Sequence, residues 1–416
     1  MRAVFGSVVV QASSSAAVVA AALLVASQMG LAAQGEFALL RSWSDALVTI
    51  AVLGLPQGLL HLTYRDAVPI AVLGQWVRRY VLVLFVLCAT VGACVVFWAM
   101  DHRTGPALSV ATAGLIAASV PFAAAHTLWR SLLLRHAGAI RYAFITAIPA
   151  WLILIGLLPV CHLGLRDALA WPLLGSAVGA AVISGVLVQR AGRNQPAAVS
   201  ASLGWSRQTL WRVSIETGAQ NVLIALSPAM VMSCATWAGA SLAQIGAVSL
   251  GLHVYQLFGV GAAYLAPMFY DRVARTGSVM TNRQLRHRLL DLATWQSGVG
   301  IVTACAVALL VVRLLWPKDA DSWALLMLMA LAGILSMAVR LLITLMLARG
   351  VFRPLTFQAM ARLMLSVGGS VALMQTCPAM LAVPLALALT EVVVLGWLIR
   401  LTQATDSTEP VAAGSA

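Results

Sequence analysis

Residues 142–162, YAFITAIPAWLILIGLLPVCH, decide the fold class of this chain. The stretch contains no Asp, Glu, Lys or Arg. It is long enough to cross a bilayer as a helix, because the ~30 Å hydrocarbon layer takes about 20 residues. Arg141 precedes it and Arg166 follows it, where charged side chains reach the polar headgroups. The sequence therefore predicts a membrane-spanning helix over 142–162.

Similar apolar stretches recur along the 416 residues. Hydrophobic residues make up 61% of the chain and charged residues 9%, whereas a soluble domain has about 45–50% and about 25%. A soluble enzyme is thereby excluded, and an all-α integral membrane protein with about 12 transmembrane helices is predicted. The expected spans are 4–28, 36–62, 79–100, 106–129, 142–162, 168–189, 209–232, 241–269, 292–316, 322–348, 355–376 and 379–401.

The positive charge of the chain is explained by its orientation in the membrane. There are 26 Lys and Arg against 13 Asp and Glu, a net charge of +13. If the N-terminus is cytoplasmic, twenty of the 26 basic residues, Arg362 among them, are assigned to the cytoplasmic side and four to the other. This bias follows the positive-inside rule and puts both termini in the cytoplasm. Binding to nucleic acid is not expected, since no aromatic residues alternate with the basic ones.

The longest polar interval near the middle of the chain lies between Gln189 and Arg207. It divides the predicted spans into six and six, each set starting from the same side, as in parallel repeats. The predicted domains are an N-terminal six-helix bundle over 1–189, a basic cytoplasmic linker over 190–208, a C-terminal six-helix bundle over 209–402 and a polar cytoplasmic tail over 403–416.

No motif in the sequence predicts catalysis. The patterns G-x-x-x-x-G-K-[ST], H-E-x-x-H and G-x-S-x-G are absent, and the six cysteines form no C-x-x-C pair. We therefore expect no catalytic residue, no metal site and no cofactor. A conduit fits this sequence better than a catalyst does.

Ionisable residues inside spans are the informative ones, because each costs at least ~2.5–3.5 kcal/mol in hydrocarbon. Arg41 and Asp45 lie four residues apart on one face of the predicted span 36–62. One hypothesis makes this face a cavity wall where Arg41 attracts an anionic group. The other makes the two residues a self-neutralised pair that fixes helix packing.

A second group of polar residues lies in the predicted span 209–232. Glu216 and Gln220 share a helical face, and Asn221 is adjacent. These residues suit either a water-filled cavity or hydrogen bonds between helices. In the predicted spans 322–348 and 379–401, Arg340 and Glu391 lie at comparable depths, so they could pair with each other or serve transport.

His253 lies within the predicted span 241–269, where a lone histidine is more often a packed hydrogen-bonding residue than a proton relay. The assignments that follow from these patterns fall into two sets. Substrate binding is assigned to Arg41, Arg340, Gln220 and Asn221; ion coupling or charge pairing is assigned to Asp45, Glu216, Glu391 and His253.

Four short runs carry a resemblance to a known family. GEFALLRS at 35–42 and VLGLPQG at 52–58 resemble the second span of polysaccharide flippases, which read G-x-[YF]-[GA]-x and later L-G-[LF]-[PS]. VSLGL at 248–252 and YLAP at 264–267 are similar to the equivalent span of the second half. The chain thus resembles the oligosaccharidyl-lipid branch of the multidrug/oligosaccharidyl-lipid/polysaccharide exporter superfamily. It lacks the two extra spans of the lipid II flippases.

The resemblance implies two six-helix bundles that form a V around a central cavity and work by alternating access. It implies flipping of polyprenyl-pyrophosphate-linked oligosaccharide repeat units across a bacterial inner membrane, for surface or secreted polysaccharide. The expected partners are the polyprenyl-linked glycan, the lipid bilayer and a polysaccharide polymerase or export complex. Protons or sodium could drive transport through Asp45, Glu216 or Glu391.

Three alternatives stay open. A multidrug or cation antiporter of the same superfamily would favour an acidic cavity. A membrane-embedded polysaccharide polymerase typically needs a large external loop, whereas the external loops predicted here are all short. A non-transporting membrane partner in a polysaccharide assembly complex is the third alternative.

Overall fold

The computed structural model describes residues 2–64, 68–101, 110–193, 207–256, 258, 322–348 and 353–407. These residues are almost entirely helical, and no strand occurs among them. Eight described segments are long and apolar enough to cross a membrane: Ala12–Met29, Ile70–Gly92, Ala111–Leu134, Ile140–His162, Arg166–Arg193, Gly218–Trp237, Trp323–Ile343 and Ala379–Thr402. The predicted all-α membrane fold class is therefore confirmed. The predicted span 292–316 and the later part of 241–269 lie outside the described residues.

The contacts within the chain divide it into two units, Met1–Met232 and Ser233–Ala416. The division falls inside α7 (Arg207–Trp237). Residues 194–206, which include most of the predicted linker, lie outside the described residues. The predicted domain boundaries at 189 and 209 accordingly stay a prediction, and each unit is described by itself.

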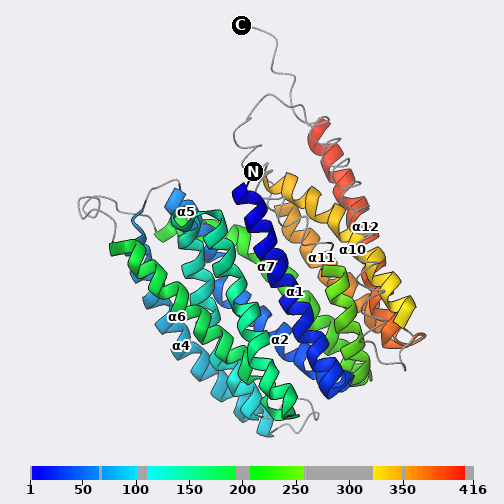
Figure 1. Cartoon of the computed structure of the whole chain (residues 1–416). Coiled ribbons are helices and arrows are strands. Elements are labelled where there is room, and N and C mark those ends of the chain that lie inside the picture. The colour runs from blue at the N-terminus through cyan, green and yellow to red at the C-terminus, as the bar shows by residue number, and fades with distance from the viewer. Residues whose placement is uncertain are drawn as a thin grey trace. The chain divides into compact units, whose positions relative to one another are not determined.

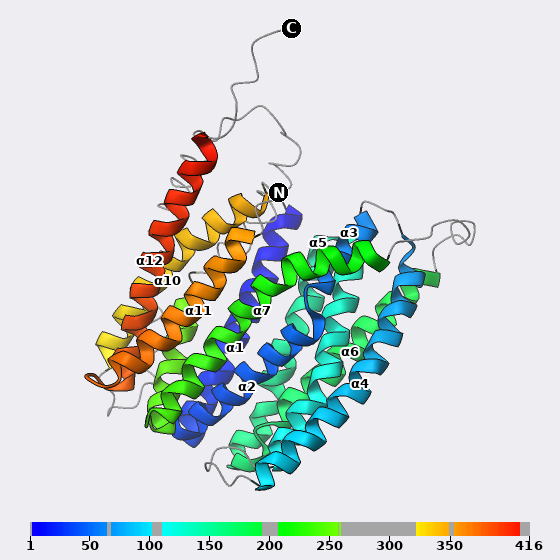
Figure 2. The same cartoon turned by 180° about the vertical axis from the view of Figure 1, so that it is seen from behind.

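The first unit is built around its longest helix, α5 (Val110–His162). Against α5 lie α1, α4 and α6, which run beside it in Figures 1 and 2. Buried leucines of α5, Leu128 and Leu132, share one core with Leu59 of α3 and Leu73 of α4. The other elements of this unit are α1 (Arg2–Met29), α2 (Leu31–Val52), α3 (Leu55–Tyr64), α4 (Ile70–Asp101), η1 (Arg166–Ala168), α6 (Trp171–Arg193) and most of α7.

α5 contains two membrane crossings in one helical segment. Ile116 and Leu157 belong to the same core cluster, although a straight helix would separate them by about 60 Å. The chain must therefore reverse its direction between them. The two candidate spans in α5, Ala111–Leu134 and Ile140–His162, match the predicted spans 106–129 and 142–162. The residues between these two spans remain helical.

The predicted span 36–62 is divided in the structure, because the helix breaks between α2 and α3. Leu53 and Gly54 both adopt left-handed backbone conformations, with φ of 36° and 70°. The N–H of Leu53 closes α2 on the Thr49 carbonyl at 3.0 Å, and the Gly54 carbonyl accepts from the N–H of Gln57 at 3.0 Å as α3 begins. Pro56 has no N–H to continue the ladder of α2.

Tyr80 of α4 caps this break. Its O–H donates to the carbonyl of Ala51 at 2.6 Å, and its ring stacks on Trp76 with centroids 5.5 Å apart. The bond satisfies one of the carbonyls that the end of α2 leaves without a helical partner. We expect Tyr80→Phe to lower the free energy of unfolding by about 1–2 kcal/mol.

Thermal unfolding of the purified protein in detergent measures this effect. Tyr142→Phe is the matched control, since the Tyr142 hydroxyl makes no hydrogen bond within the described part of the chain. Equal melting temperatures for the two variants would contradict the capping role of Tyr80.

The second unit holds the end of α7, a helix over 242–256, α10 (Ser322–Ala348), α11 (Arg353–Leu373) and α12 (Ala379–Ser407). Both α10 and α11 pack against α12, and the three run side by side in both views. Their shared apolar core includes Leu342 of α10, Leu355 of α11 and Leu398 of α12.

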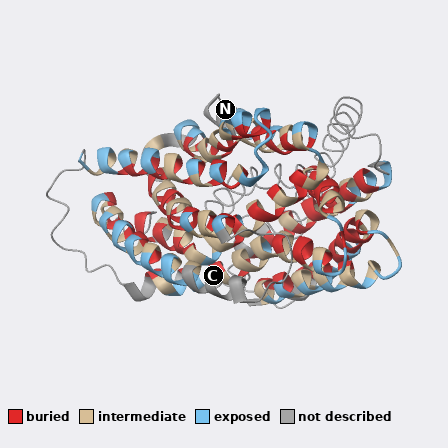
Figure 3. Ribbon diagram, turned by 90° about the horizontal axis from the view of Figure 1, so that it is seen from below, coloured by how far each residue is buried: buried red, intermediate tan, exposed pale blue. Residues whose placement is uncertain are grey.

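The two faces of α11 differ in chemistry in the way expected of a membrane helix. Its exposed large side chains are apolar: Phe357, Met360, Met364 and Leu365. Its buried polar side chains are Gln358, Ser366 and Ser370, spaced at multiples of four residues. Figure 3 shows buried and exposed residues alternating along the helices, so that each helix turns one face inward. An outward apolar face and an inward polar stripe suit a lipid surround.

Candidate functional site

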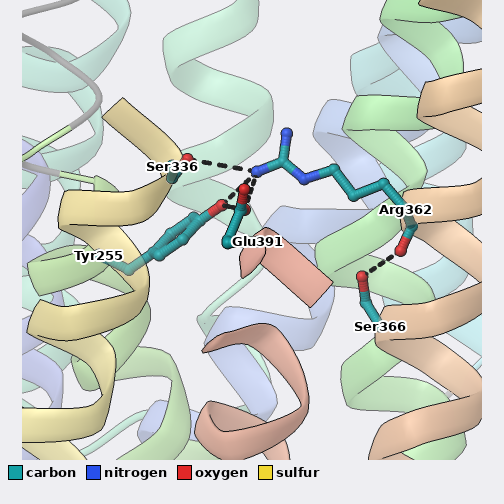
Figure 4. A network of polar contacts seen from close by, with 5 residues as sticks. All are labelled: Tyr255, Ser336, Arg362, Ser366 and Glu391. Carbon is teal, nitrogen blue, oxygen red and sulfur yellow. Dashed lines mark hydrogen bonds and ion pairs between the residues drawn. The ribbon is translucent and has the colours of Figure 1, made fainter. Parts of the chain in front are cut away.

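A buried polar site in the described part of the second unit joins four helices. Arg362 comes from α11, Glu391 from α12, Ser336 from α10 and Tyr255 from the helix over 242–256. Figure 4 shows these four side chains pointing toward one another. We call this group the buried charge cluster.

The contacts of the cluster centre on two atoms. The O–H of Tyr255 donates to Glu391 Oε1 at 2.6 Å. Nη2 of Arg362 donates to the same Oε1 and to the Tyr255 hydroxyl oxygen. The same nitrogen also donates to Ser336 Oγ at 3.3 Å. One carboxylate oxygen and one guanidinium nitrogen therefore hold all four helices together.

Burial makes this arrangement obligatory. The side chain of Glu391 is 0% exposed and that of Arg362 is 11% exposed. Either charge alone would be strongly unfavourable there, whereas the pair is neutral and hydrogen-bonded. Arg340 of α10 is also close enough to act electrostatically on Tyr255.

Two serines of α11 form hydrogen bonds with the backbone next to Arg362. Ser366 Oγ donates to the Arg362 carbonyl, and Ser370 Oγ donates to the Ser366 carbonyl at 2.6 Å. These bonds satisfy buried hydroxyls within the helix itself. In contrast, Glu391 Oε2 and both amide atoms of Gln358 have no hydrogen-bond partner among the residues described.

Sequence reasoning did not select Arg362, whose side chain is 11% exposed, as a site residue. The orientation count assigned Arg362 to the cytoplasmic side. In the structure Arg362 is the tenth residue of α11, about 14 Å along the helix from its start, and its side chain is 11% exposed. The arginine that the structure pairs with Glu391 is Arg362, where Arg340 had been expected. The spacing of Gln358, Arg362 and Ser366 inside the predicted span 355–376 is the signal that could have found it.

Arg41 and Asp45 do form the expected i, i+4 pair on α2, with Nε and Oδ2 3.9 Å apart. The side chain of Arg41 is 21% exposed, but that of Asp45 is 73% exposed. A long pair with one exposed partner contributes about 0–1 kcal/mol. The pair therefore adds little to helix packing.

The polar residues of α7 are only partly described. The side chain of Gln220 is buried and that of Asn221 is half-buried. Glu216 lies in the helical backbone of α7, but its side chain lies outside the described part. The predicted common face of Glu216 and Gln220 therefore holds for the helical backbone alone.

His253 is half-buried on the helix over 242–256, two residues before Tyr255. Sequence reasoning selected His253 and did not select Tyr255. The structure places Tyr255, not His253, in the buried charge cluster. Within the described residues, no three His, Cys, Asp or Glu side chains are grouped as ligands for a metal ion.

Comparison with known proteins establishes the fold. The chain matches no protein-family model and no curated protein sequence. Among solved structures, it matches an inward-facing multidrug resistance MATE family transporter of the MOP superfamily, with a TM-score of 0.68 and 14% identity, over 97% of this chain and 99% of that one. It also matches the lipid II flippase MurJ in an inward closed conformation, with a TM-score of 0.69 and 11% identity, over 96% and 88% of the two chains. At sequence identities this low, the structural similarity shows that the fold is shared and does not show a shared function.

Proposed function

We propose that this protein is a membrane transporter that works by alternating access and flips polyprenyl-pyrophosphate-linked oligosaccharide repeat units across the bacterial inner membrane. The observation that supports transport is the fold, which the chain shares over almost its whole length with a transporter and with a lipid II flippase. The sequence resemblance at 35–42 and 52–58 supports the polysaccharide branch.

A flippase solves a definite physical problem. A pyrophosphate with attached sugars cannot enter a ~30 Å hydrocarbon layer without replacing its hydration. Arg41 is suited to this role, because its guanidinium is partly exposed and its ion pair with the exposed Asp45 is long, at 3.9 Å. Gln220, Asn221 and Arg340 are the further residues we assign to the substrate, with Gln220 and Asn221 as hydrogen-bond partners for sugars.

The multidrug antiporter is the second candidate, since a MATE transporter is among the matching structures. An exporter of cationic drugs would draw on acidic side chains in its spans. Glu391, one of the three acids singled out from the sequence, is engaged by Arg362 in the structure. While this pair is formed, Glu391 is not available to bind a cationic drug.

The proposed function also implies an orientation in the membrane and a partner complex. Both termini would lie in the cytoplasm, as the distribution of basic residues predicts. A polysaccharide polymerase or export complex would act on the flipped unit at the outer leaflet.

A deletion strain of the native host tests the proposal. We expect polyprenyl-linked repeat units to accumulate, surface polysaccharide to fall, and the accumulated units to remain inaccessible to an external glycan-modifying enzyme. Accumulated units that are accessible from outside would instead indicate a polymerase. Normal glycan together with raised drug sensitivity would replace the flippase by an efflux pump.

Arg41→Ala is expected to lower glycan export about tenfold or more, because a charge-assisted hydrogen bond contributes about 1.5–3 kcal/mol. Arg41→Lys should retain part of the export, since it keeps the charge but not the forked geometry. The measurement is surface polysaccharide in a deletion strain that expresses each variant. Arg166→Ala, an exposed arginine of η1, is the control. Full export by a stably folded Arg41→Ala protein would remove Arg41 from the site.

A further inference from the structure

Three oxygens from three helices converge on a single nitrogen in the buried charge cluster. Glu391 Oε1, the Tyr255 hydroxyl oxygen and Ser336 Oγ all accept hydrogen bonds from Arg362 Nη2. Figure 4 shows Arg362 reaching in from α11 to meet them. A carboxylate and neutral oxygens around one positive centre are the kind of ligand set that binds a hard cation. Here the positive centre belongs to the protein itself.

We propose that Arg362 is a built-in counter-cation, whose guanidinium occupies a latent site for a monovalent cation formed by Glu391, Tyr255 and Ser336. In the native protein, Glu391 therefore takes no coupling ion. Removal of the guanidinium opens the site to Na⁺.

Burial explains why the site needs a cation of some kind. Glu391 is fully buried, so its charge must be compensated locally. A tethered guanidinium compensates it without the loss of translational freedom that capture of a free ion requires. A guanidinium also stays protonated at every physiological pH, so the compensation does not vary with proton concentration.

The cluster is equipped to hold an ion once Arg362 is gone. Glu391 Oε2 has no hydrogen-bond partner among the described residues, so it can serve as a further ligand. The three oxygens are fixed on separate helices that pack in the second unit, and their positions do not depend on α11 alone.

The proposal gives different roles in transport to the acids selected from the sequence, which are Asp45, Glu216 and Glu391. Glu391 becomes a structural anchor for Arg362, and Asp45 and Glu216 remain as the acids that could couple transport to protons. The proposal concerns the ion pair itself and does not depend on which substrate is carried.

Thermal unfolding in detergent tests the proposal, with NaCl compared against choline chloride at equal ionic strength. The measurement is made at about pH 8.5 for every variant. The wild-type protein is expected to melt at the same temperature in both salts. Arg362→Gln is expected to melt lower in choline and to gain about 3 °C or more from Na⁺.

Two further variants identify the group that binds Na⁺. Arg362→Gln with Glu391→Gln is expected to melt alike in both salts, because the carboxylate ligand is absent. Arg362→Lys keeps a cation tethered to the chain. Its melting temperature is therefore also expected to be the same in NaCl and in choline chloride. Wild-type protein stabilised by Na⁺ through Glu391, or Arg362→Gln unaffected by Na⁺, would overturn the proposal.

The double variant also carries the test if Arg362→Gln alone does not fold. It removes both charges of the Arg362–Glu391 pair, so it should be recovered where the single variant is not. Loss of both variants would show that Arg362 acts through something other than the charge of Glu391, which also overturns the proposal. Glycan export is not measured, so these outcomes leave the proposed function to its own test.

Discussion

Glu391→Leu is expected to lower the free energy of unfolding by about 3–5 kcal/mol, because it leaves the buried guanidinium of Arg362 without its partner. The Tyr255 hydroxyl also loses its acceptor, since its O–H donates to Glu391 Oε1 at 2.6 Å. Chemical or thermal unfolding of the purified protein measures the loss. Asp167→Asn, at an exposed acid of η1, should change stability by less than about 0.5 kcal/mol.

A rescue experiment separates the charge from the packing. Arg362→Met combined with Glu391→Leu replaces the pair by apolar side chains of similar size. Exchanges of this kind are often neutral or stabilising by about 1–4 kcal/mol. We therefore expect the double variant to recover most of the stability that either single variant loses. Additive losses in the double variant would show that the two residues do not act as a pair.

Gly54→Val is expected to cost about 3 kcal/mol or more, through backbone strain and overlap together. Gly54 has a φ of 70°, a conformation that β-branched residues rarely adopt. A Cβ at this position would lie 2.7 Å from the Cα of Gly218 in α7 and closer still to the Ser214 carbonyl oxygen. Both obstacles are backbone atoms of a long helix, so neither can move aside alone.

Gly218, on the α7 side of the contact with Gly54, gives a second test. A Cβ at Gly218 would lie 2.6 Å from the Leu53 carbonyl carbon and oxygen, so Gly218→Val should destabilise the same junction. Gly175→Ala in α6 is the control, since open space surrounds that position and its backbone is helical. Alanine there should be neutral or stabilising by up to about 1 kcal/mol. A Gly54→Val protein as stable as Gly175→Ala would refute the close approach of α7 to the α2–α3 break.

Several features of the fold followed from the sequence. The uncharged run at 142–162 predicted a membrane helix, and the structure places a candidate span at Ile140–His162. The i, i+4 spacing of Arg41 and Asp45 predicted a pair that the structure contains. Such features depend on residues close in the chain, where the helical repeat fixes which side chains meet.

Other features required the folded chain. LGLP at 53–56 was visible, but only contact with Ser214 and Gly218 of α7 reveals why the helix breaks there and lets α7 approach. Arg362 looked like a residue near the membrane surface, because charge counting by loops takes no account of the direction of a side chain. Its burial depends on Glu391, Tyr255 and Ser336, which come from three other helices.

The sequence by itself determined that this chain is helical and lies in a membrane, because composition and local spacing decide whether a segment can satisfy its backbone inside lipid. It also singled out Glu391 as a buried acid. Only the tertiary structure decided which arginine compensates that acid. A hydrocarbon interior leaves a buried charge few partners, and the choice among them is set by helix packing between residues far apart in the chain.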